Sequence, residues 1–181
     1  MISKDVLQFW FDQANRRTWF EASTELDELV RRRLGPFYAE AAEGRLSAWK
    51  GDADGALALC VLFDQVPRNI FRGSPRAFAT DPWARAVARH ILASGFDRLY
   101  PTDDHRLFSY LPFEHSEDLE DQRLGLQLFT LRTADGRSAR HASRHLEIIA
   151  RFGRFPHRNA VLGRPSTAAE LAFLKKSGPS F

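Results

Sequence analysis

The sequence lacks the features that mark membrane, secreted and thiolate-metal proteins. No hydrophobic run approaches the length of a transmembrane span. The N-terminus, MISKDVLQFWFDQ, has neither the apolar run nor the small-residue cleavage site of a signal peptide. The single cysteine, Cys60, cannot form an intramolecular disulfide or a thiolate metal site, and its apolar neighbours indicate a buried position. We therefore expect a cytoplasmic protein that does not contact a membrane.

The common catalytic and nucleotide-binding motifs are also missing. There is no G-x-x-x-x-G-K-[ST] phosphate loop, no G-x-G-x-x-G and no G-x-S-x-G nucleophile elbow. The segment HASRH places His141 and His145 at metal-ligand spacing but lacks the glutamate of H-E-x-x-H, and Glu-x-x-His does not occur. The sequence therefore predicts no metal site and no cofactor.

Bulky apolar residues are abundant in this chain. Its 181 residues are 44% hydrophobic and include 15 phenylalanines and 4 tryptophans, which predicts a single domain over 1–181. The 26 basic residues barely exceed the 23 acidic ones, and both signs are interspersed, so no nucleic-acid partner is expected. Only 4 of the basic residues are lysine, and arginine suits bidentate binding of carboxylates and phosphates, although genome composition also accounts for this bias.

Helical spacing of apolar residues dominates, and strand alternation is absent. We predict helices over 4–17, 24–43, 56–65, 82–94, 115–133, 139–152 and 167–176. Gly35-Pro36 is expected to kink or divide the second helix, and Pro67 to bend or end the third. Caps are expected at Ser74 and Asp81, each followed by proline, and at Thr167 with Glu170. The predicted class is all-α.

Three of these helices carry polar residues on otherwise apolar faces. Asp64 ends the stripe of the third predicted helix, and Arg68 falls one turn further on, placed to pair with it. His115 and Gln122 share the apolar face of the fifth, and His145 that of the sixth. These residues either satisfy one another as a buried structural network or line one shared pocket.

The stretch RFGRFPHRN, residues 151–159, mixes arginines with phenylalanines. Gly153 is expected to end one helix and Pro156 to begin another, so that the N–H groups of residues 157–159 point outward between Arg154 and Arg158. This arrangement is typical of an anion site. The acidic segment EHSEDLED (114–121) offers the alternative that the protein itself occupies the site.

Long blocks of the sequence resemble one bacterial family, DUF924. The blocks are VLFDQVPRNIFRGSPRAFATD, LPFEHSEDLEDQ and RFGRFPHRNAVLGRPSTAAELAFL, and together with an N-terminal match they cover nearly the whole chain. The resemblance implies a right-handed, TPR-like array of antiparallel helices and supplies no reaction. The polar positions that it implicates are Asp64, Gln65, Arg68, Asn69, Arg72, Glu114, His115, Glu117, Gln122, Arg151, Arg154, His157, Arg158 and Asn159.

Three functions remain open at this point, and the sequence decides neither catalysis nor oligomeric state. The first is binding of a small phosphate- or carboxylate-bearing ligand, or of a peptide end, by Arg154, Arg158 and backbone N–H groups near Asp64 and His115. The second is a hydrolase or transferase that uses Glu114, His115 and His157 as acid and base. The third is a protein-interaction scaffold whose polar residues are purely structural.

Overall fold

The computed structural model describes residues 2–16, 18–19, 23–134 and 136–177, and within them every regular element is a helix. The all-α class is therefore confirmed. The α-helices are α1 (Ser3–Trp10), α2 (Gln13–Arg16), α3 (Thr24–Ala42), α4 (Ala53–Cys60), α5 (Val66–Ile70), α6 (Asp81–Ser94), α7 (Asp103–Glu114), α8 (Leu119–Arg132), α9 (Arg137–Phe152) and α10 (Ala168–Ser177). Short 3₁₀ turns and one π-helical segment, Val61–Gln65, connect several of them.

Most predicted helix ends coincide with the expected local signals. Gly95 and Gly153, with φ of 69° and 68°, end α6 and α9 in the left-handed conformation that glycine tolerates. The capping box of α10 forms, because Thr167 N–H donates to Glu170 Oε2 at 2.7 Å and Glu170 N–H to Thr167 Oγ1 at 3.2 Å. Ser74 accepts from the N–H of Arg76 and so caps a short 3₁₀ turn.

Several boundary predictions were wrong. The helix predicted over 4–17 is divided into α1 and α2 after Trp10, and its last residue, 17, lies outside the described residues. Pro36 does not divide α3, which continues to Ala42. The helix α7 was not predicted, and His115 is the C-cap of α7 and not part of the following helix. Asp81 is the first residue of α6, after the cap residue Thr80, which frees its carboxylate for a tertiary contact.

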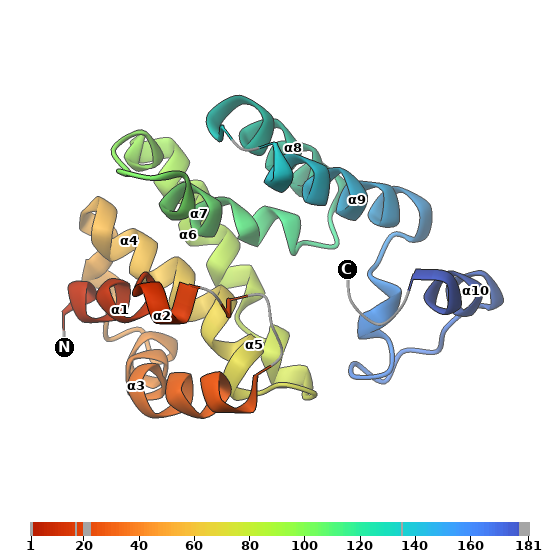
Figure 1. Ribbon diagram of the computed structural model, residues 1–181, viewed down its shortest axis with the longest axis horizontal. Coiled ribbons are helices and arrows are strands. Elements are labelled where there is room, and N and C mark those ends of the chain that lie inside the picture. The colour runs from red at the N-terminus through yellow and green to blue at the C-terminus, as the bar shows by residue number, and fades with distance from the viewer. Residues whose placement is uncertain (1, 17, 20–22, 135, 178–181) are drawn as a thin grey trace.

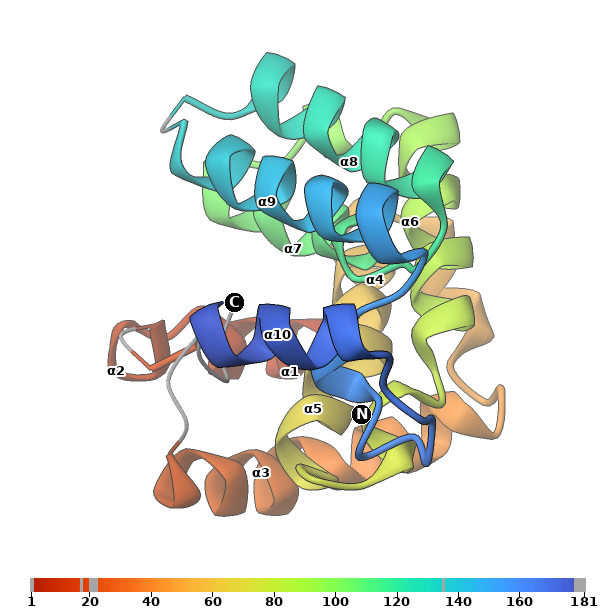
Figure 2. The same cartoon turned by 90° about the vertical axis from the view of Figure 1, so that its right-hand side faces the viewer.

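The helices pack largely in chain order. α6 packs on α7, α7 on α8 and α8 on α9, whereas α1, α3, α5 and α6 surround α4 and the π-helical segment. In both overall views α8 and α9 lie side by side, and α10 lies apart from them, below α9 as drawn (Figures 1 and 2). Within the described residues no helix combines the length and the apolar character needed to cross a bilayer.

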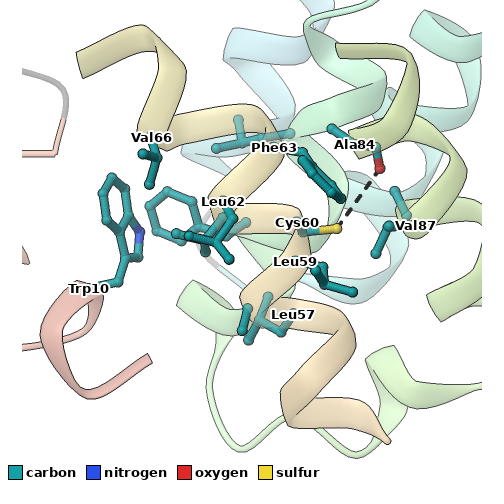
Figure 3. Packing of buried hydrophobic residues seen from close by; sticks show 14 of the residues in the cluster. Trp10, Leu57, Leu59, Cys60, Leu62, Phe63, Val66, Ala84 and Val87 are labelled. Carbon is teal, nitrogen blue, oxygen red and sulfur yellow. Dashed lines mark hydrogen bonds between the residues drawn. The ribbon is translucent and has the colours of Figure 1, made fainter. Parts of the chain in front are cut away.

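The main core forms around α4 and the π-helical segment. Leu57, Leu62 and Val66 are fully buried, and Trp10 of α1 packs on them with only 1% of its surface exposed (Figure 3). Cys60 points to the opposite side, where its thiol approaches Ala84 O at 4.0 Å. Burial raises the pKa of this thiol, which confirms the expected buried, apolar cysteine. A second, smaller cluster of Ile148, Ile149 and Phe155 joins α9 to the turn that follows it.

Candidate functional site

The site begins where α4 continues through the π-helical segment into α5. Pro67 has no N–H to donate to Phe63 O, but it does not end the helix, which widens into a π turn just before it and continues to Ile70. The buried Thr80 hydroxyl donates to Phe63 O at 2.7 Å, and Arg68 Nη1 donates to Asp64 O at 2.6 Å. Side chains therefore satisfy helix carbonyls at this point, and Asp64 is turned inward with 1% exposure.

Asp64 and His115 form a dyad. His115 Nδ1 lies 2.8 Å from Asp64 Oδ1 and 2.9 Å from Oδ2. Burial opposes the negative charge of Asp64, but Arg68 and His115 outweigh this effect and hold its pKa below its ordinary value. Burial lowers the pKa of His115, and Asp64 only partly offsets it. At neutral pH a neutral imidazole therefore donates its Nδ1 proton to an ionised carboxylate.

The other ring nitrogen of His115 points away from this carboxylate. Nε2 makes no hydrogen bond within the described ranges, and it is not fully enclosed, since 18% of the side chain is exposed. An imidazole whose Nδ1 proton is fixed in this way presents an unprotonated Nε2 that can accept a proton. The predicted approach of His115 to Asp64 thus yields an oriented base.

Two arginines lie on the other side of Asp64. Arg68 makes the predicted one-turn contact with Asp64 at 3.5 Å, but its main partner is Asp81, to which Nη1 and Nη2 donate at 2.8 and 3.1 Å. Arg158 approaches the same Asp81 carboxylate, with Nη1 3.6 Å from Oδ2. The carboxylate of Asp81 therefore contacts two guanidinium groups, but it accepts hydrogen bonds only from Arg68.

Arg158 is a buried cation without a hydrogen-bonding partner. The residue is 7% exposed, its guanidinium lies over the rings of Phe78 and Phe155 at 4.7 and 4.5 Å, and it makes no hydrogen bond to any described residue. Burial and the neighbouring Arg68 lower its pKa to about 10. Only Nε is completely enclosed, so the Nη groups remain open to an acceptor. A buried unsatisfied polar group costs about 1–3 kcal/mol, and more when charged.

The turn after α9 explains the mixture of residues in 151–159. Phe155 is fully buried and touches both Arg158 and the histidines His145 and His157, at ring separations of 5.4 and 5.5 Å. The helix expected at Pro156 is a 3₁₀ turn of three residues. Its i to i+3 bonds occupy the N–H groups of Arg158 and Asn159, so the predicted backbone anion cradle was wrong.

Several predicted site residues instead hold the turn together. Arg154 forms two hydrogen bonds of 2.7 and 2.9 Å with Glu170, not with the acidic segment. Glu117 of that segment accepts from Phe155 N–H at 2.7 Å and from Arg164 at 2.7 and 2.9 Å. Arg154, in contrast to Arg158, is therefore occupied internally, but by Glu170 and not by the segment 114–121 that the alternative from the sequence named.

Other candidates also have structural partners. Gln122 donates to three carbonyls at the end of α7, and Asn69 donates to Gln65 O at 3.1 Å. Arg72 pairs with Asp27 at 2.6 and 2.7 Å on the surface. The further partners are Asp64 for Gln65, Ser166 and Arg164 for Asn159, and the rings of Phe152 and Phe173 for the exposed Arg151. Apart from Gln65, which contacts Asp64 of the dyad, these residues do not join the dyad and Arg158.

Three further titratable groups surround the dyad. Burial and the charge of Asp64 raise the pKa of Glu114 to about 8. Burial lowers the pKa of His145 to about 4, and it does the same to His157, with Arg158 adding to the effect. Glu114 Oε1 lies 3.2 Å from His145 Nδ1, but burial favours the neutral form of both groups at pH 7, so this contact is not an ion pair.

Two surface pockets lie outside this cluster. One, of about 250 Å³, is largely apolar and includes Phe63, Trp83 and Val87. The other, of about 490 Å³, is lined by Arg151, Arg154 and Glu170 among others. Neither contains Asp64, His115 or His157, so the hollow expected between these residues stays a prediction. Among the described residues no group of three or more potential metal ligands converges.

The sequence analysis missed three contributors to the site. The sequence analysis assigned Asp81 only as a helix cap, and its position at the start of α6 was the one feature of the sequence that singled it out. Phe78 and Arg164 lie within the blocks that carry the family resemblance, but no local pattern distinguishes their roles. Their contacts arise from chain segments that are distant in sequence.

The fold and the cluster together define a helical protein with a buried Asp–His dyad beside an unsatisfied arginine. The family described as "Bacterial protein of unknown function (DUF924)" matches residues 6–178, and the chain belongs to this family. A solved structure of a protein of unknown function from Agrobacterium tumefaciens is similar, with 36% identity, a TM-score of 0.91 and 97% of each chain covered. A comparison with curated proteins found no match.

Proposed function

We propose that this protein binds a small anionic ligand, bearing a phosphate or a carboxylate, against the guanidinium of Arg158. The observation that supports this proposal is the burial of the Arg158 guanidinium without a hydrogen bond to any described residue. A planar guanidinium presents five N–H donors in a fork that matches carboxylate and phosphate oxygens. The rings of Phe78 and Phe155 fix the plane of this fork before a ligand arrives.

The neighbouring groups are suited to an anion. His157 and His115 are neutral at pH 7, because burial lowers the pKa of each. Glu114 is mostly protonated at that pH, since its pKa is raised to about 8. The full negative charges nearby are those of Asp64, Asp81 and Glu117. Arg68 contacts the two aspartates, and Arg164 binds Glu117. The guanidinium of Arg158 is thus a buried cation whose ion-pair contact with Asp81, at 3.6 Å, is too long for a hydrogen bond.

Thermal unfolding in sodium phosphate tests this proposal, with ionic strength held constant by sodium chloride. A ligand at 100 times its Kd stabilises the folded state by about 2.7 kcal/mol. For a domain of this size, that corresponds to a rise in Tm of about 5 to 10 °C. Adipate and a short peptide with a free carboxylate replace phosphate in parallel melts, which separates the three anion sources.

Matched variants identify the arginine responsible. Arg158→Met should abolish the rise in Tm, and Arg158→Lys should keep only part of it, because lysine lacks the fork. Arg151→Met is the control, since that residue lies in the same motif but is exposed. If Arg158→Met responds to phosphate like the wild type, the proposal fails and the cluster is a structural network.

A second function has one specific observation in its favour. The Asp64–His115 pair, at 2.8 and 2.9 Å, is the arrangement of an oriented general base, which supports acid–base catalysis on the bound anion. The TPR-like order implied by the resemblance is likewise proposed, supported by the packing of α6 to α9 in chain order. The cytoplasmic location stays a prediction.

A further inference from the structure

The buried Asp64–His115 dyad is a feature that anion binding by Arg158 does not require. The anion site proposed above depends on Arg158 and does not require Asp64. Asp64 is nevertheless buried at 1% exposure, and its carboxylate contacts His115, Arg68 and its neighbour Gln65. A π-helical segment and the Thr80 hydroxyl bond to Phe63 O hold it there. π turns are rare and often occur at functional sites. The carboxylate fixes one tautomer of His115, and this matters for proton transfer.

We propose that His115 Nε2 is the general base of a hydrolase that cleaves small carboxylic esters carrying a separate anionic group. This inference rests on the proposed function, because the anionic group of the substrate would lie against Arg158. His115 is then a catalytic residue, and Asp64 is a positioning residue that acts through it. The nucleophile is a water molecule that binds to Nε2. This nitrogen makes no hydrogen bond to any described residue and is not enclosed.

The reaction balances without any further reagent. Nε2 accepts a proton from the water as the water oxygen bonds to the ester carbonyl carbon, giving a tetrahedral intermediate and an imidazolium. Asp64 stabilises this imidazolium through Nδ1–H. The carbon–oxygen bond to the alcohol then breaks, and the departing oxygen takes the proton from Nε2. The products are a carboxylic acid and an alcohol, and His115 returns to its neutral form.

The charges that face His115 come from every element packed around it. These are Asp64 and Arg68 on the π-helical segment and α5, Glu114 on α7, His145 on α9, and His157 and Arg158 on the turn after it. Burial and the two arginines favour the neutral imidazole, and Asp64 favours the charged one. The base is therefore available at pH 7, and its protonation requires a pH below the ordinary pKa of histidine.

A pair of chromogenic esters tests the proposal on the whole protein. Mono-4-nitrophenyl adipate carries the anionic group, and 4-nitrophenyl hexanoate is its neutral counterpart. We expect kcat/KM to favour the adipate ester and to fall at low pH as His115 is protonated. His115→Gln should lose about 100- to 10,000-fold in kcat, the usual range for a general base. His90→Gln is the control, because His90 contacts Lys50 O on the surface.

Asp64→Asn distinguishes a positioning role of Asp64 from a purely structural one. If Asp64 acts by orienting His115, this variant should fold and show a lower kcat with KM nearly unchanged. Should either dyad variant fail to fold, diethyl pyrocarbonate provides a second test on the wild type. The reagent acylates unprotonated imidazole nitrogens, and mass spectrometry should find His115 modified in step with the loss of turnover. An unmodified His115, or adipate ester turnover no faster than in His115→Gln, would overturn the proposal.

The two proposals fail in different ways. If phosphate still raises the Tm through Arg158 while neither ester is hydrolysed, anion binding stands and the general-base role is refuted. If both esters are hydrolysed equally and Arg158→Met changes neither rate, the dyad stands and the anion site is refuted. Arg158→Met should otherwise raise KM for the adipate ester and leave the hexanoate ester unaffected.

Discussion

Replacing Glu114 by glutamine should make the protein more stable in alkaline solution. Glu114 is 5% exposed, and its pKa is about 8, because burial and the charge of Asp64 disfavour the carboxylate. In the unfolded chain a glutamic acid loses its proton near pH 4.3. Between these two values the folded state holds more protons than the unfolded state, so the free energy of unfolding falls as the pH rises.

The size of this effect follows from the two pKa values. Between pH 6.5 and 8.5 the glutamate should cost the folded state about 2 kcal/mol, and between pH 4.5 and 8 about 4 kcal/mol. His145 and His157, whose pKa values are lowered to about 4, act in the opposite sense as the pH falls below about 6.5. Between pH 6.5 and 8.5 these two histidines together add about 0.8 kcal/mol of stability, which is less than Glu114 removes, and their effect cancels in a comparison with Glu114→Gln because both proteins contain them.

Urea unfolding at intervals between pH 6.5 and 8.5 measures this difference. The wild type should lose about 2 kcal/mol more than Glu114→Gln over the window. Glu28→Gln removes a carboxylate whose side chain is 58% exposed, and this variant should follow the wild-type curve. Parallel curves for wild type and Glu114→Gln would show that Glu114 is ionised in the folded protein, and the electrostatic description of the site would then be wrong.

Three further substitutions test the fold around the site. Gly55→Ala should cost about 3 kcal/mol in urea unfolding, because its Cβ would lie 2.2 Å from Trp49 O, whereas Gly51→Ala has open space and should change stability by less than about 1 kcal/mol. Thr80→Val should cost about 1–3 kcal/mol, because it removes the donor to Phe63 O; an unchanged midpoint would mean that this carbonyl finds another partner. The pKa of Glu170 is lowered to about 2, first by Arg154, so Glu170→Gln should lower the Tm at pH 6 and approach the wild type as the pH falls from about 4.5 to 2.

The helical class and most caps were predictable because they depend on neighbours within four residues. Gly95, Gly153 and the Thr167–Glu170 box act locally, and all behave as expected. The continuation of the helix through Pro67 was not predictable in the same way. It depends on Thr80, which lies 17 residues from the carbonyl that it satisfies.

The site residues show the same limit. The one-turn spacing predicted the contact between Asp64 and Arg68, but Arg154 and Arg158 were equivalent on the sequence. They differ because Glu170, 16 residues after Arg154, reaches that arginine with two hydrogen bonds, whereas Arg158 shares Asp81 with Arg68. Which arginine is satisfied is decided by tertiary contacts that local spacing does not encode.

This difference between satisfied and unsatisfied groups separates a structural network from a functional site. In a purely structural network nearly every buried donor finds an acceptor, as Arg154, Gln122 and Asn159 do here. Within the described part of the chain this rule has exceptions in the core, such as Trp10 Nε1, and also in the cluster, where neither the guanidinium of Arg158 nor Nε2 of His115 has a hydrogen-bonding partner. The two groups interact electrostatically, because the positive charge of Arg158 contributes to lowering the pKa of His115. A buried guanidinium without an acceptor and an imidazole nitrogen without a donor both lower the stability of the fold. A bound anion would supply the acceptor to Arg158, and a water molecule would supply the donor to His115.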